Sequence, residues 1–156
     1  MQKLVLYSAI VLTVILGCSK DKFGTTPSIK IKSISPGSQV PFGQDLVFDL
    51  DFTDKQGDLD TVFIKKVRLN TLPVQMQLNP LIVYPVPDFP AKSKGELQIT
   101  INYNNPLISA QPPHTQTGAP NNTEPDTLVF KLVVKDKAGN VSDTVATGPI
   151  VVERKL

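Results

Sequence analysis

The stretch Leu46-Val47-Phe48-Asp49-Leu50-Asp51-Phe52-Thr53-Asp54 decides the fold class of this 156-residue chain. Large apolar side chains occupy every second position, and mostly polar side chains lie between them. Strict alternation with a period of two predicts a β-strand with one buried face and one face in water. Residues 96–103 show the same alternation, so the pattern is not confined to one segment.

Further strands are indicated by apolar runs that end at turn signals. They are expected at residues 28–34, 61–69, 126–135 and 141–152, the last two forming a hairpin around a Gly-Asn turn. The facing of the strand 61–69 is less clear, although Phe63, Val67 and Leu69 share one side. Lys65 interrupts that side, and a bulge at this residue would resolve the conflict.

Two long segments are expected to lie outside the main sheets. Prolines break residues 70–94, and only 81–84 is predicted to form a strand, at a sheet edge, because proline cannot donate within a central ladder. Residues 104–125 are rich in Pro, Asn and Thr and are predicted to be a loop without regular structure. A loop of that length is either functional or mobile.

The composition favours an all-β protein. Fourteen prolines and the absence of tryptophan argue against a helical bundle, and short strands separated by turns are typical of a sandwich or barrel. The length suits one folded domain, expected at 28–156. Sixteen basic residues face fourteen acidic ones, so the charge gives no electrostatic footprint for nucleic acid.

The first eighteen residues have the pattern of an export signal. Lys3 precedes a short apolar run at 4–16, and Gly17 and the only cysteine, Cys18, follow it. The end of this run, Ile-Leu-Gly-Cys at 15–18, resembles the lipobox of bacterial lipoproteins. The resemblance implies that residues 1–17 are a cleaved signal peptide and that Cys18 carries a lipid anchor. A transmembrane helix would need about 20 apolar residues, more than this run contains.

The residues after Cys18 bear on where the protein is located. Residues 18–27 are polar and turn-rich, which predicts a flexible tether between the lipid and the folded body. Ser19 stands where lipoproteins retained at the enterobacterial inner membrane carry aspartate, so the outer membrane is the expected location. Residues 20–22 only partly resemble the export tag of surface lipoproteins, which leaves a periplasmic or a surface-facing orientation open.

Two turns resemble those of known β-proteins. The segment 133–142 is similar to the final hairpin of bacterial immunoglobulin-like domains, with Asp136, Gly139 and Asn140 in its turn. The segment 52–59 looks like a turn found in lipid-anchored Ig-like proteins of the Bacteroidota. The resemblance implies an Ig-like antiparallel β-sandwich of seven or eight strands and carries no catalytic residues with it. The cysteine pair and tryptophan of antibody domains are missing.

The same two turns contain candidate metal ligands. In an Ig-like sandwich they lie at the same end, so five oxygen-bearing side chains are predicted to converge there: Asp54, Asp58, Asp60, Asp136 and Asn140. Calcium takes six to eight oxygen ligands, and backbone carbonyls and water could complete such a shell. The alternative is that these side chains only cap their own turns.

Three Asp-Thr-aliphatic triplets place a threonine at 61, 127 and 144. They are similar to the O-glycosylation acceptor pattern of exported Bacteroidota proteins, which would modify Thr61, Thr127 or Thr144. The alternative is structural, because an Asp followed by a β-branched residue is also what a turn leading into a strand looks like.

No sequence pattern indicates catalysis. His114 is the single histidine, is expected to be exposed, and has no neighbouring metal ligands. No Gly-x-Ser-x-Gly elbow is present. The edge segment with Leu81, Val83 and Tyr84 is the candidate contact for a partner. The leading hypothesis is a non-catalytic interaction or structural module of the cell envelope, and the alternatives are a calcium-stabilised adhesin-like module and a glycan-binding accessory protein of a polysaccharide-uptake system.

Overall fold

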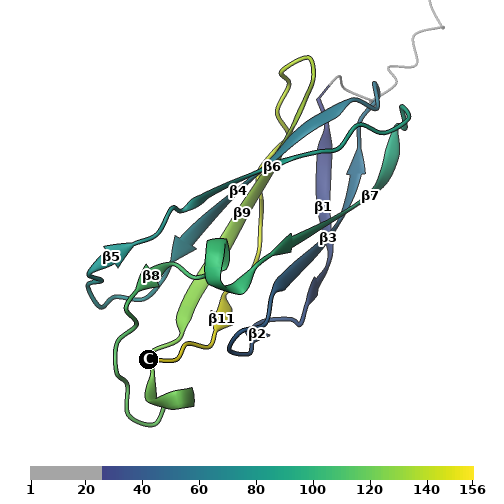
Figure 1. Cartoon of the computed structure of the whole chain (residues 1–156). Helices are drawn as coiled ribbons and strands as arrows, with labels where there is room; N and C mark the ends of the chain where they lie inside the picture. Colours follow the sequence, from purple (N-terminus) through teal and green to yellow (C-terminus); the bar gives the residue numbers. More distant parts are fainter. Residues whose placement is uncertain (1–25) are drawn as a thin grey trace, which may run out of the picture.

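The computed structural model of the chain describes residues 26–156 (Figure 1). The predicted signal peptide, Cys18 and most of the predicted tether lie outside the described residues. Within 26–156, no helix has the length and apolar character needed to cross a membrane.

Eleven strands are present in the described part of the chain, seven of them with three residues or more. The strands are β1 (Ser28–Ser35), β2 (Gln39–Val40), β3 (Leu46–Thr53), β4 (Leu59–Arg68), β5 (Met76–Gln77), β6 (Leu81–Pro85), β7 (Lys94–Ile101), β8 (Ala110–Gln111), β9 (Asp126–Asp136), β10 (Val145–Ala146) and β11 (Ile150–Val152). Two short helical turns, Tyr103–Leu107 and Pro120–Asn122, lie between β7 and β9.

The strands form two packed layers, as Figure 1 shows. One sheet has the order β1-β3-β7, and the other has the order β2-β11-β9-β4-β6, with β10 also paired to β9. A two-stranded sheet of β5 and β8 lies at one end. The all-β prediction is confirmed, and the sheets are antiparallel except where β2 runs parallel to β11.

The alternating stretch forms β3, the central strand of the three-stranded sheet. Leu46, Phe48 and Leu50 are fully buried, and Asp51 on the other face is exposed. Phe48 meets Phe130 of β9 edge to face, with ring centroids 5.5 Å apart. This aromatic contact, which joins the two layers, lies in a single core that both sheets contribute to.

The structure shows the facing of β4, which the sequence left open. Val62, Ile64 and Lys66 are buried, whereas Phe63 and Val67 are half-buried on the outer face. Lys66 tolerates the core side because its ammonium donates to the backbone carbonyls of Pro106 and Ile108. The register shift lies between Leu59 and Thr61, so Lys65 needs no bulge.

The predicted strand 141–152 is broken into short pieces. Val141 makes an isolated bridge to Lys135, and β10 and β11 follow separately. Gly148 and Pro149 separate these two strands, since proline has no N–H for a ladder.

The segment 104–125 contains more structure than predicted. Leu107, Ile108 and Ala110 are buried in it. Ala110 also accepts a hydrogen bond from the buried guanidinium of Arg154 at 2.9 Å. The first part of this segment is therefore packed into the body of the protein.

Candidate functional site

Three carboxylates converge where the β3–β4 turn meets the turn after β9. Asp54, Asp58 and Asp136 each offer an oxygen within 4.8 Å of the others, and we call them the acidic cluster. Asp54 and Asp136 are buried, and Asp58 is half-buried. The sequence placed these residues at one end of the molecule, and the structure brings them together.

Two members of the acidic cluster have turn-capping hydrogen bonds. The Oδ2 of Asp54 accepts from the backbone N–H of Asp58 at 2.8 Å. The Oδ1 of Asp136 accepts from the backbone N–H of Asn140 at 2.8 Å, and its Oδ2 accepts from the side-chain amide of Asn140 at 2.7 Å. Turn capping therefore accounts for Asp54 and Asp136.

Asp58 differs from the other two members. Its Oδ1 is enclosed and has no hydrogen-bond partner among the described residues. Loss of solvent contact raises the pKa of the Asp58 carboxyl, and a hydrogen bond to Asp54 and the charges of Asp54 and Asp136 raise it further. Three carboxylates this close repel one another, and a proton or a cation would relieve the repulsion.

The other two predicted ligands are Asp60 and Asn140, and both bond to neighbouring side chains. Asp60 turns to Lys135, with 3.4 Å between Oδ2 and Nζ, and accepts from the Thr61 hydroxyl at 2.8 Å. These bonds lower the pKa of Asp60. Asn140 uses its amide nitrogen on Asp136. The prediction that five side chains converge was therefore wrong for Asp60.

Gly57 fixes the turn that carries Asp58. Its φ is +68°, and a Cβ at this position would lie 2.5 Å from the backbone nitrogen of Lys92. A neighbouring cavity of about 180 Å³ is lined by Asp58 and by Lys137, whose ammonium lies 2.8 Å from Asp88. The cluster therefore borders a small polar hollow.

The three threonines predicted as glycosylation acceptors differ in exposure. Thr144 is exposed just before β10, whereas Thr61 and Thr127 are half-buried within strands. The Thr61 hydroxyl donates to Asp60, which leaves it less available.

The predicted edge strand is present as β6, which pairs only with β4. Leu81 and Val83 are 45% and 53% exposed. Tyr84 is half-buried and packs against the core, so it contributes less to the outer surface than predicted.

His114 is half-buried instead of exposed. Its Nε2 lies 2.6 Å from the carbonyl oxygen of Pro73. This contact ties the 104–125 segment to the proline-rich segment before β5.

Two further features were not predicted. Arg154 and Asp126 form a buried ion pair at 2.8 Å, and the Nε of Arg68 lies 4.0 Å from the same carboxylate. Their positions in the sequence are far apart, and no local pattern signals the pairing.

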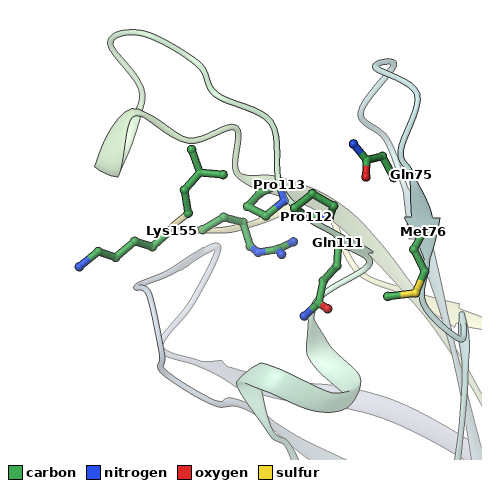
Figure 2. Close-up of a pocket in the computed structure, with 8 residues that line it drawn as sticks. Gln75, Met76, Gln111, Pro112, Pro113 and Lys155 are labelled. Atoms are coloured by element: carbon green, nitrogen blue, oxygen red, sulfur yellow. The ribbon is translucent and has the colours of Figure 1, made fainter.

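The second unpredicted feature is an open pocket of about 630 Å³ (Figure 2). Gln75 and Met76 lie on one side of Pro112 and Pro113, and Lys155 lies on the other side. The pocket combines amide, apolar and cationic groups but holds no nucleophile beside a general base.

Comparison with known proteins leaves the family open. No protein-family model and no curated protein match the chain. The β-glucosidase from Listeria innocua in complex with glucose is 10% identical with a TM-score of 0.39, over 83% of this chain. A mutant of that enzyme with laminaribiose gives 11% and 0.40. The chain spans 16% of the length of these proteins, and the likeness is too weak to support a function.

Proposed function

We propose that the protein is a non-catalytic interaction or structural module of the bacterial cell envelope, anchored by lipid on Cys18 at the outer membrane. The observation that carries the proposal is the exposed apolar surface of β6, where Leu81 and Val83 point away from the core. Neighbouring exposed apolar side chains that form a contiguous patch are typical of contact surfaces.

The fold supports an Ig-like type for this module. The sheets β1-β3-β7 and β2-β11-β9-β4-β6 correspond to the A-B-E and G-F-C layers of an Ig sandwich, with an added strand on each side of the second layer. In that comparison, the acidic cluster lies in the B–C and F–G turns.

The lipid anchor is tested on the protein purified from membranes. Mass spectrometry of its N-terminal peptide should show cleavage before Cys18 and an acylated sulfur. A Cys18→Ser variant, exported and cleaved by means of a non-lipoprotein signal peptide in place of residues 1–17, should lack the modification and leave the membrane fraction. A full-length, unmodified thiol in the native protein contradicts the anchor.

The contact surface is tested by a photoreactive diazirine amino acid at Val83 in living cells. A protein or lipid adduct should form there, and it should be absent when the same amino acid replaces Gln98 on the opposite sheet. Equal or absent labelling at both positions contradicts the proposal. Deleting residues 104–125 is a poor test, because Leu107 and Ile108 belong to the core.

A calcium-stabilised module is the second candidate, supported by the acidic cluster. A divalent cation would satisfy the enclosed Oδ1 of Asp58 and neutralise its repulsion with Asp54 and Asp136. Binding to the folded state raises the melting temperature by mass action.

The calcium prediction has a matched control in the chain. Millimolar calcium should raise the melting temperature, EDTA should reverse the rise, and Asp58→Asn should abolish it. Asp60→Asn, outside the cluster, should keep the response. If calcium does not change the melting temperature of the native protein, this candidate is excluded. A shared proton then explains how the repulsion among the three carboxylates is reduced.

A further inference from the structure

Strands β4, β6 and β9 carry apolar side chains on both faces of their sheet. β9 buries Leu128, Phe130 and Leu132 in the core and also carries Val129 and Val133 on its outer face. A strand of a sheet with one wet face normally alternates apolar and polar residues, as β3 does. The outer face of this sheet therefore mixes apolar side chains with lysines.

The pairing register assembles these side chains into rows. Phe63 of β4 lies opposite Val83 of β6 and Val133 of β9. In the next row, Lys65 lies opposite Leu81 and Lys131. We call these residues the outer face: Phe63, Lys65, Leu81, Val83, Lys131 and Val133. Figure 1 shows β6, β4 and β9 side by side on one side of the molecule.

The charges of the outer face are positive and unpaired. Lys65 and Lys131 are exposed and have no ion-pair partner within residues 26–156. Lys135 lies opposite Thr61, on the other side of the Phe63 row, and its ammonium is 3.4 Å from Asp60. The partner that fits is therefore anionic and has apolar groups close to its charges.

The opposite sheet, β1-β3-β7, has an outward face of different composition. Its outward side chains include three lysines and three carboxylates: Lys30, Lys32, Lys94, Asp49, Asp51 and Glu96. It exposes no large apolar side chain. A second copy is therefore a poor partner, because two outer faces would place lysines against lysines, and the opposite sheet has no apolar surface to offer.

Addition of a partner strand at β6 is also disfavoured. The backbone N–H of Lys66 donates to Pro80, and that of Val86 donates to Asp60. Because backbone groups alternate in direction along a strand, Leu81, Val83 and Pro85 direct theirs away from β4. The N–H of Leu81 is taken by the side chain of Asn79 at 2.9 Å, and proline has none. One outward N–H, that of Val83, is left, so an added strand would find a single backbone donor at this edge.

The distance to the membrane favours lipid as the partner. The described chain starts at Thr26, and eight residues from Cys18 reach about 26 Å when extended. We propose that the outer face lies on the anionic lipid surface to which the chain is anchored. The inference rests on the proposed lipid anchor and assigns the partner of its exposed apolar surface.

The outer face needs only a low affinity for lipid, because the tether holds the folded body close to the membrane. Each lysine near an anionic bilayer contributes roughly a fivefold gain in binding. A short tether gives a high local concentration of lipid, so weak contacts suffice to orient the body.

The test compares lysines on the two sheets of the full chain, purified from membranes and reconstituted in vesicles. Acetylation by a membrane-impermeant reagent is measured at each lysine by mass spectrometry. In vesicles of phosphatidylcholine mixed with phosphatidylglycerol, labelling of Lys65 and Lys131 should fall severalfold relative to pure phosphatidylcholine. Labelling of Lys30 and Lys94 should not change, and high salt should restore labelling at the outer face.

Two double variants with the same change in net charge distinguish docking of the outer face from a general attraction between the protein and the anionic membrane. In Lys65→Glu with Lys131→Glu, the protection of Lys135 by anionic vesicles should be lost, and in Lys30→Glu with Lys94→Glu it should remain. Equal labelling of both sheets in anionic vesicles overturns the proposal. Protection that occurs in native membranes but not in lipid vesicles also overturns it and assigns the face to a protein partner.

The same digests report the anchor separately. The mass of the N-terminal peptide shows whether Cys18 is acylated, independently of the lysine labelling. An acylated chain with unprotected lysines refutes docking alone, and an unmodified Cys18 refutes the anchor on which the inference rests.

Discussion

Lys66 is the residue whose environment departs most from what its type suggests. Its ammonium is buried beneath the 104–111 segment and is held by two backbone carbonyls. Burial lowers the pKa of Lys66 from 10.5 to about 8, and the charge of Asp126 opposes this shift. The folded protein therefore holds this proton less tightly than the unfolded chain does.

This shift predicts a rise in stability with pH. Below pH 8 both states are protonated, whereas between about 8 and 10 the folded state loses the proton first, so the free energy of unfolding should increase by about 1 to 3 kcal/mol. Urea unfolding at a series of pH values measures it, and Lys66→Met should flatten the curve. Above pH 10 the raised pKa of Tyr103 acts in the opposite direction. A native curve as flat as that of the variant contradicts the assignment.

Gly57 gives a second prediction for a single residue. Gly57→Ala should lower the free energy of unfolding by about 2–4 kcal/mol, because a Cβ would meet the backbone of Lys92 in addition to the strain of a positive φ. Gly118 also has a positive φ but has open space around it, so Gly118→Ala should cost only about 1 kcal/mol. Equal losses in the two variants would show that the Lys92 contact relaxes freely.

Among the elements, the strands with strict alternation could be predicted from the sequence and the others could not. β3 and β7 follow their patterns because each has one face in water. The inner face of β4 could not be assigned, because a lysine on the core side is unexpected without knowledge of the carbonyls of the 104–111 segment. The same limit applies to the acidic cluster, in which the irregular register at Asp60 directs this residue toward Lys135.

The buried pair between the start of β9 and the chain after β11 gives a prediction for these elements. Arg154→Met should cost about 3–5 kcal/mol of stability, because it leaves the Asp126 carboxylate uncompensated in a buried site. Lys32→Met, which breaks the exposed pair with Glu96, should change stability far less, because water screens this pair. Chemical denaturation of both variants makes the comparison. Similar values for the two pairs would contradict a dominant role for burial.

At the scale of the whole molecule, both sheets share one core and should unfold together. Tyr84 reports on the five-stranded path through β6, and Tyr103 follows the last strand of the other sheet. Urea unfolding followed by tyrosine fluorescence and by far-UV circular dichroism should give coincident single transitions. Separate transitions would show that the layers unfold independently. A Phe48→Ala variant that changes only the fluorescence signal or only the circular dichroism signal would show the same.

The parallel pairing of β2 with β11 has a consequence for biosynthesis. It joins residues 39 and 40 to residues 151 and 152, so a growing polypeptide cannot close this sheet until residue 152 has been synthesised. A chain that is still being synthesised therefore keeps β2 without its pairing partner.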